Sequence, residues 1–222
     1  LGAVLLPRLS YYVGSGQKDK FYQLINKTIN FVVAMSLPLT IYFILMANES
    51  ILFLSGSGYE PAVAAMQIIL PTILLIGLSN VTGIQVLTPL GMERYVLISV
   101  IVGAMVDLIL NTLFIPGYGS AGAAFGTLMA ELAVLIVQIV FIRHMIQEKI
   151  FDYHQILRIG LLAILRIFTI LLIKSWSLGV FWSLLCSAVL YFGIYFLLSL
   201  LLNVHIIKDY TLTILKKLHH IH

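Results

Sequence analysis

The stretch from Ile101 to Glu131 reads IVGAMVDLILNTLFIPGYGSAGAAFGTLMAE and is apolar enough to lie in a lipid bilayer. It nevertheless places Asp107, Asn111 and Glu131 inside two apolar runs, which the sequence IPGYGS separates. An ionisable side chain in the hydrocarbon region costs about 2.5–3.5 kcal/mol on insertion scales. The stretch therefore predicts a transmembrane helical hairpin whose acids have either a partner or a functional role.

Helical geometry predicts where these acids lie. Asp107 and Asn111 are four residues apart and share one helix face. On the second helix, Thr127 and Glu131 have the same spacing, beside a stripe of small residues that allows another helix to approach closely. At about 1.5 Å per residue, both acids lie roughly 14–17 Å from the turn, near the middle of the membrane. The spacing leaves open whether the two acids face each other.

The composition of the whole chain agrees with a membrane protein. Of 222 residues, 61% are hydrophobic and only 10% are charged, and the mean hydropathy is +1.07. Soluble domains carry about 25% charged residues. Apolar runs of about 20 residues without strict alternation indicate helices rather than a barrel. The fold class is therefore all-α, a polytopic transmembrane helix bundle.

The apolar runs predict six full spans and the end of a seventh. The full spans cover about 30–46, 62–86, 95–115, 121–142, 159–173 and 178–202, and the partial helix ends at Pro7. Pro38 and Pro71 lie inside spans and predict kinks. We interpret the chain as the C-terminal fragment of a larger transporter. Residues 1–145 would form core helices, and residues 146–222 two further helices and a tail.

The basic residues predict the orientation. Eleven of the 13 Lys and Arg residues fall on one side of the predicted spans, Lys174 falls on the other, and Arg166 lies within a span. Loops rich in Lys and Arg remain on the cytoplasmic side. We therefore expect a multi-pass protein of the cytoplasmic (cell) membrane with its C-terminus in the cytoplasm. The net charge of +4 is too small to indicate nucleic-acid binding.

The sequence contains no motif that predicts catalysis. HExxH, GxSxG, CxxC and P-loop patterns are absent, and Cys186 is the single cysteine. A glycine-rich GYGSAG between two membrane helices, with no strand before it, is a poor nucleotide site. We therefore expect neither an enzyme, nor a cofactor, nor a metal centre.

The polar residues inside the spans are the candidates for an ion or substrate pathway. Asp107 and Asn111 are candidate ligands for Na+, and Asp107 or Glu131 for H+. Their structural alternative is a hydrogen bond between helices. Arg166 is a candidate for binding an anionic phosphate head group, or it pairs with an acid or extends to the interface.

Three further residues complete the candidate set. Asn80 and Gln85 lie in a span that is unusually polar for a lipid-facing helix, which suggests a wall facing protein or a wet cavity. Their alternative role is packing. Arg8 is a candidate for the cytoplasmic mouth of a cavity, or an ordinary positive-inside anchor.

Several motifs in order resemble a known family. VLLPRLS, GIQVLTPLGMERY and GAMVDLILNTLFIPGYGSAGAAFGTLMAE are similar to the C-terminal lobe of polysaccharide flippases, in the multidrug/oligosaccharidyl-lipid/polysaccharide exporter superfamily. The resemblance covers about residues 1–145. It implies a two-lobe transporter that alternates between inward- and outward-open states. It also implies the substrate, a polyprenyl-pyrophosphate-linked oligosaccharide for bacterial polysaccharide biosynthesis, and as partners the missing N-terminal lobe and membrane lipids.

Three other interpretations remain open from the sequence. A cation-coupled multidrug or metabolite exporter of the same superfamily would give a drug-resistance phenotype. A non-transporting scaffold of a polysaccharide-assembly complex would have no need of acids in mid-membrane. A membrane glycosyl transferase would need catalytic residues on long external loops, and the predicted external loops are short.

Overall fold

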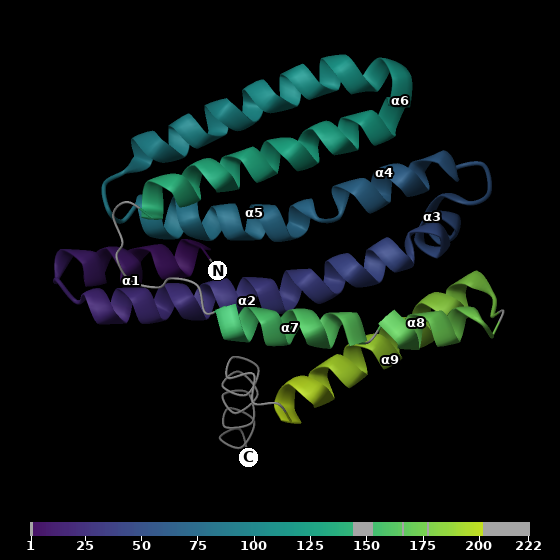
Figure 1. The fold of residues 1–222 in the computed structure, drawn as a ribbon. Helices are drawn as coiled ribbons and strands as arrows, with labels where there is room; N and C mark the ends of the chain where they lie inside the picture. Colours follow the sequence, from purple (N-terminus) through teal and green to yellow (C-terminus); the bar gives the residue numbers. More distant parts are fainter. Residues whose placement is uncertain (1, 144–152, 166, 177, 202–222) are drawn as a thin grey trace.

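We describe the chain from a computed structural model, which defines residues 2–143, 153–165, 167–176 and 178–201. Every regular element among them is helical, so the predicted all-α class is confirmed. In chain order the elements are α1 (Gly2–Gly14), α2 (Lys18–Leu45), α3 (Ala47–Ser55), α4 (Pro61–Ile69), α5 (Thr72–Asn80), η1 (Val81–Leu87), α6 (Glu93–Arg143), α7 (Tyr153–Leu165), α8 (Ile167–Lys174) and α9 (Val180–Leu201). Figure 1 shows α6 at one side of the bundle, then α4 and α5, then α2, with α7 to α9 beyond.

The number of membrane crossings matches the prediction. Five helical stretches in the described ranges are long and apolar enough to cross a membrane. One of them is α6, whose 51 residues reverse direction at Gly119 (φ 54°, ψ −128°) and so supply two crossings. Glycine permits this positive φ because it has no Cβ. The six full spans are therefore present, and the 13-residue α1 stands in place of the partial one.

Two expected boundaries were wrong. Pro7 does not end the first helix, because α1 continues through it to Gly14. The helix expected from residue 30 begins at Lys18, since Phe21, Ile25 and Ile29 are buried at helical spacing and give its first turns an apolar face.

One expected loop also proved to be helical. Residues 47–55 form α3, which follows α2 after a bend at Met46 (φ −103°, ψ 19°). Met46 and Ala47 are fully buried at this bend. Their burial fixes α3 against the end of α2, although the sequence ANES resembles a loop.

The second predicted span is not one regular helix. α4 and α5 are separated at Leu70 and Pro71, which confirms the kink expected from a proline that has no N–H to donate. The Thr40 hydroxyl of α2 donates to the Leu70 carbonyl at 3.4 Å. Beyond α5 the chain winds into a seven-residue π-helix, η1, which the sequence analysis did not anticipate. π-Helical turns are rare and occur frequently at functional sites.

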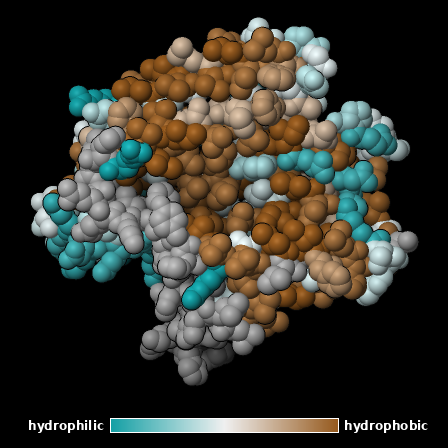
Figure 2. Space-filling view, in the orientation of Figure 1, coloured by the Kyte–Doolittle hydropathy of each residue, from teal (hydrophilic) through white to brown (hydrophobic). Residues whose placement is uncertain are grey.

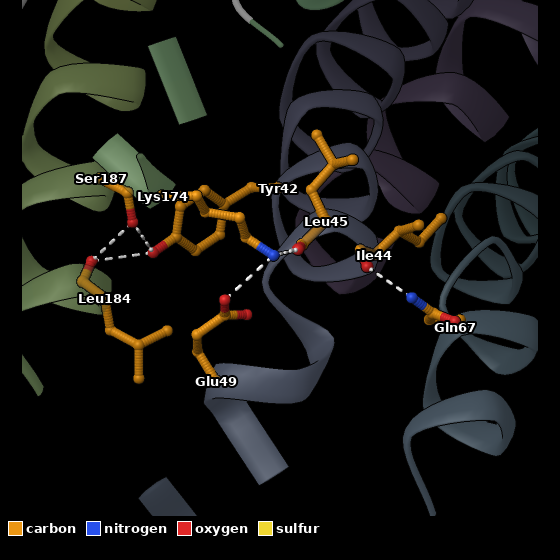
Figure 3. Close-up of polar contacts among 8 residues, drawn as sticks. All are labelled: Tyr42, Ile44, Leu45, Glu49, Gln67, Lys174, Leu184 and Ser187. Carbon is orange, nitrogen blue, oxygen red and sulfur yellow. Dashed lines mark hydrogen bonds and ion pairs between the residues drawn. The ribbon is translucent and has the colours of Figure 1, made fainter. Parts of the chain in front are cut away.

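The last turn of α2 joins several helices (Figure 3). Its carbonyl oxygens at Ile44 and Leu45 accept hydrogen bonds from Gln67 of α4 (3.1 Å) and Lys174 of α8 (2.7 Å). Lys174 also forms an ion pair with Glu49 of α3 at 3.0 Å. These bonds satisfy carbonyls that a helix end leaves without partners. We call this group of residues the α2 joint.

Basic residues gather at the opposite end of the bundle. Arg94 and Arg143 lie at the two ends of the α6 hairpin, where the Tyr95 and Phe141 rings are 4.2 Å apart. Lys174, which the sequence places on the other side of the spans from most Lys and Arg residues, lies instead at the α2 joint. Figure 2 shows a face covered mainly by hydrophobic side chains. The cytoplasmic placement of the basic end remains a prediction, and residues 202–222 lie outside the described ranges.

Candidate functional site

A cavity of about 440 Å³ lies between α5, η1 and the two halves of α6. We call it the acidic cavity because Asp107 and Glu131 both line it. Its lining residues are Ile76, Ser79, Asn80, Gly83, Ile84, Val96, Val100, Gly103, Ala104, Asp107, Thr127, Ala130, Glu131, Val134 and Gln138. The structure thus brings Asn80, Asp107 and Glu131 together from three helical segments.

At one end of the cavity, Asp107 accepts two hydrogen bonds. Asn111 donates its side-chain N–H to Oδ2 at 3.0 Å, and Thr127 donates its hydroxyl to Oδ1 at 3.4 Å. The Asn111 Oδ1 atom is buried and has no hydrogen-bond partner in the described ranges. Gly126 makes this arrangement possible, since a Cβ there would collide with that oxygen. The carboxylate is therefore held in place, and the Asn111 amide oxygen packs against Gly126 instead of lining the cavity.

Glu131 lies on the same face of α6 as Thr127, one turn further along, and lines the same cavity. No hydrogen bond joins its carboxylate to another residue in the described part of the chain. The lining set contains two acids and neither Lys nor Arg. The cavity therefore presents an uncompensated negative character, which favours a cation or a proton over an anion.

The other end of the cavity holds a polar network that the sequence analysis missed. Thr82 of η1 donates its hydroxyl to Gln138 Oε1 at 2.5 Å. Gln138 donates its amide N–H to Ser99 Oγ at 3.1 Å. All three side chains are at most 2% exposed. The sequence did contain a signal for this network. Gln138 is a polar residue in an apolar run, and helical spacing places it on the same face of α6 as Thr127 and Glu131.

The remaining predicted residues are dispersed. Asn80 lines the cavity and donates to the Ile76 carbonyl of its own helix at 2.8 Å. Gln85 does not line it and is buried, with no partner for Oε1 in the described ranges. Arg8 is exposed on α1, where its Nε donates to the Tyr12 hydroxyl at 2.9 Å. Arg166 lies outside the described residues. The structure therefore gathers the acids and Asn80, and separates Gln85 and Arg8 from them.

The fold and this cavity define a polytopic helical membrane protein with two half-buried acidic groups lining a cavity between its helices. A family model described as the lipid II flippase MurJ matches residues 1–197. The chain belongs to this flippase family. The expected superfamily is thereby confirmed, while the narrower assignment to polysaccharide flippases remains a prediction.

Individual relatives agree with this assignment. An uncharacterized membrane protein of Methanocaldococcus jannaschii is 27% identical over 220 residues, covering 98% of this chain and 43% of the relative. The lipid II flippase MurJ of Bacillus subtilis is 26% identical over 187 residues, covering 82% of this chain and 34% of the relative. The chain thus spans less than half the length of these curated relatives.

A solved structure shows the same fold. It is a lipid II flippase MurJ in an inward closed conformation, with a TM-score of 0.75 and 16% sequence identity. The match covers 90% of this chain and 41% of that structure.

Proposed function

We propose that the chain is part of a flippase that moves a polyprenyl-pyrophosphate-linked saccharide from the cytoplasmic to the outer leaflet by alternating access. The observation that carries this proposal is the flippase family match along residues 1–197. Two substrates share this chemistry. The family description favours lipid II, and the motif resemblance favours an oligosaccharide repeat unit for polysaccharide biosynthesis.

The acidic cavity is unsuited to the pyrophosphate itself. Its lining includes Asp107 and Glu131 but no Lys or Arg, and like charges repel strongly in a low-dielectric site. A pyrophosphate head group needs cationic or hydrogen-bond-donating partners, and the lining contains neither Lys nor Arg. We therefore place the head group elsewhere in the protein, with Arg166 and Arg8 retained as candidates for contact with phosphate.

We assign the acidic cavity to a coupling cation, Na+ or H+. Asp107 lines the cavity and is oriented by two neutral donors, Asn111 and Thr127. Asn80 adds an amide side chain to the same lining. Carboxylate and amide oxygens are the ligands that hard cations prefer. Glu131 offers a second carboxylate in the same cavity, free to ligate the cation or to carry a proton.

A depletion experiment tests the flippase proposal. The gene that encodes this chain would be repressed, and lipid-linked precursors would be assayed for accessibility from each face of the membrane. We expect precursor to accumulate at the inner leaflet and wild-type expression to restore the outer pool. Separate assays for lipid II and for oligosaccharide repeat units distinguish the two substrates. Unchanged distribution of both would overturn the proposal.

The acidic cavity also favours a second candidate, a cation-coupled exporter of cationic drugs. Two carboxylates without a basic partner suit a cationic ligand as well as a coupling ion. Depletion would then change sensitivity to cationic drugs and leave both precursor distributions normal. Normal precursors together with normal drug sensitivity would favour the scaffold interpretation.

A further inference from the structure

The polar network at the Gln138 end of the acidic cavity connects three segments that are distant in the sequence. Thr82 belongs to η1, Ser99 to the first half of α6, and Gln138 to its second half. The Gln138 amide uses its oxygen toward Thr82 and its nitrogen toward Ser99. One side chain therefore holds the π-helical segment against both arms of the hairpin.

The packing around Gln138 leaves no spare room. A Cβ at Gly83 would lie 2.8 Å from Gln138 Nε2, so the amide lies directly against the η1 backbone. On the hairpin, a Cβ at Gly103 would collide with Val134. Gly83, Gly103, Val134 and Gln138 all line the cavity. The distance between η1 and α6 at this level therefore determines the width of the cavity.

Thr82 has a second set of acceptors within reach. Its hydroxyl lies 3.1 Å from the Leu78 carbonyl and 3.3 Å from the Ser79 carbonyl, both on its own chain segment. A hydroxyl has one proton to donate, so Thr82 can bond either to Gln138 or to its own helix. Separation from Gln138 would therefore leave no unsatisfied donor at Thr82, which lowers the cost of breaking the contact.

The backbone around Thr82 is wound in a π-helical register, which an α-helical register could replace. In η1, the Thr88 N–H bonds to the Gly83 carbonyl at 3.1 Å, five residues back. Pro89 follows, and Gly91 adopts a positive φ of 71°. A change from π- to α-helical bonding in η1 can be absorbed in this turn, because neither residue continues a regular helix.

We propose that Thr82, Gln138 and Ser99 form a latch that holds η1 against α6, and that the latch opens when η1 changes its helical register. Opening widens the Gln138 end of the acidic cavity. Gln138 is thus a positioning residue for this cavity. The role of the latch in transport rests on the proposed function, whereas the latch itself is a conformational property that can be measured without transport.

The test is a distance measurement between spin labels at positions 84 and 100. Ile84 and Val100 line the cavity from η1 and α6 and are 41% and 52% exposed, so labels are accommodated there. All samples would carry the full chain with Cys186→Ser, so that labelling is confined to the introduced cysteines. The unsubstituted latch should give one dominant distance.

The variants remove one part of the latch at a time. Thr82→Val keeps the shape of the side chain and removes its hydroxyl, whereas Thr82→Ser keeps the hydroxyl. We expect Thr82→Val and Gln138→Met to shift the ratio of long to short distances by about fivefold, the size expected for losing a neutral hydrogen bond. Thr82→Ser should restore the dominant short distance.

A matched control separates the latch from a general loss of packing. Ser36 of α2 is a buried hydroxyl that donates to the Val32 carbonyl of its own helix, so Ser36→Ala should leave the distances unchanged. Distances that remain single and short in folded Thr82→Val and Gln138→Met would overturn the latch. Equal broadening in Ser36→Ala would do the same. Absence of flipping by the wild-type protein would instead overturn the proposed function alone.

Discussion

Two regions of the molecule place acidic groups inside an apolar bundle, and they treat them differently. At the α2 joint, Glu49 has a basic partner, since Lys174 lies 3.0 Å away and also caps the Leu45 carbonyl. In the acidic cavity, Asp107 has only neutral donors and Glu131 has no hydrogen-bond partner in the described ranges. The joint is electrically balanced by the chain itself, and the cavity is not.

This difference separates an acid that the chain itself pairs from the two acids that we propose bind a cation or a proton. A partly buried ion pair holds helices together but requires nothing from outside. The described part of the chain gives the two carboxylates of the acidic cavity no basic partner, and a charge in an apolar surrounding is costly without one. We therefore propose that a cation or a proton provides the compensation. The same residue type thus has opposite meanings in the two regions, and the presence of a basic partner decides between them.

The largest expected effect comes from removing the oriented carboxylate. We expect Asp107→Asn to weaken the apparent affinity for the coupling cation by about 10- to 100-fold, the effect of losing a charged ligand. The measurement is the dependence of flipping on Na+ concentration and on pH in proteoliposomes. Glu131→Gln should have a smaller effect if Asp107 is the principal ligand.

The α2 joint provides the control for that experiment. Glu49→Gln likewise replaces one carboxylate by an amide, but Glu49 lies outside the cavity lining. The cation dependence should therefore stay at the wild-type value. An equal loss of cation affinity in Glu49→Gln and Asp107→Asn would show that the proposed distinction between the two regions is wrong.

The second prediction concerns packing at two glycines outside both regions, one in the α6 hairpin and one in α9. At Gly122, in the hairpin, a Cβ would lie 2.5 Å from the Phe114 carbonyl oxygen, which is backbone and cannot move aside easily. We expect Gly122→Ala to destabilise the protein by about 1–3 kcal/mol. At Gly193, in α9, nothing lies within 4 Å of such a Cβ, so Gly193→Ala should be neutral or stabilising by about 0.5–1 kcal/mol. Thermal unfolding in detergent would compare them, and equal melting temperatures would contradict the difference.

The hairpin and its two acids could be predicted from the sequence by physical arguments that agree with the structure. The cost of a charge in hydrocarbon singled out Asp107 and Glu131, and helical spacing put them at similar depth. That the two acids line one cavity depends on tertiary packing. Helical periodicity shows which residues share a helix face, but not which neighbouring helix that face contacts. Gln85 shows the same limit. Its polar character suggested a position on a cavity wall, but the structure buries its side chain outside the cavity lining.

The boundaries and the π-helix were missed for a different reason. Local propensity predicts a loop for the sequence ANES at residues 47–50. Burial of Met46 and Ala47 stabilises a helix there instead. η1 depends on how Gly83 packs against Gln138, 55 positions later in the chain. No local pattern contains that information, and Gln138 itself was overlooked because one amide in an apolar run resembles ordinary packing.

The third prediction tests the ion pair of the α2 joint. Lys174→Met leaves Glu49 partly buried without its partner, and we expect it to cost about 1–3 kcal/mol. Adding Glu49→Gln should recover much of this loss, because the uncompensated charge is removed. A double-mutant cycle of unfolding free energies measures the coupling, which we expect to be about 0.5–1 kcal/mol given side-chain exposures of 33% and 17%. Additive effects of the two substitutions would show that the pair contributes nothing.

The smallest effect is expected at an acid that belongs to neither region. Glu60 is fully exposed at the start of α4, outside the spans, and the backbone N–H groups of Glu60 and Gly58 lower the pKa of its carboxyl. A lowered folded-state pKa gives a stabilisation that is present above the unfolded pKa and is lost as pH falls through the folded pKa. Glu60→Gln should therefore lower the melting temperature slightly at neutral pH and converge with wild type in acid, below about pH 4. A constant difference across this range would mean that the side chain acts through packing instead. Since Glu60 lies outside the cavity lining, cation affinity should be identical in Glu60→Gln and in wild type, which separates this exposed acid from the two that line the cavity.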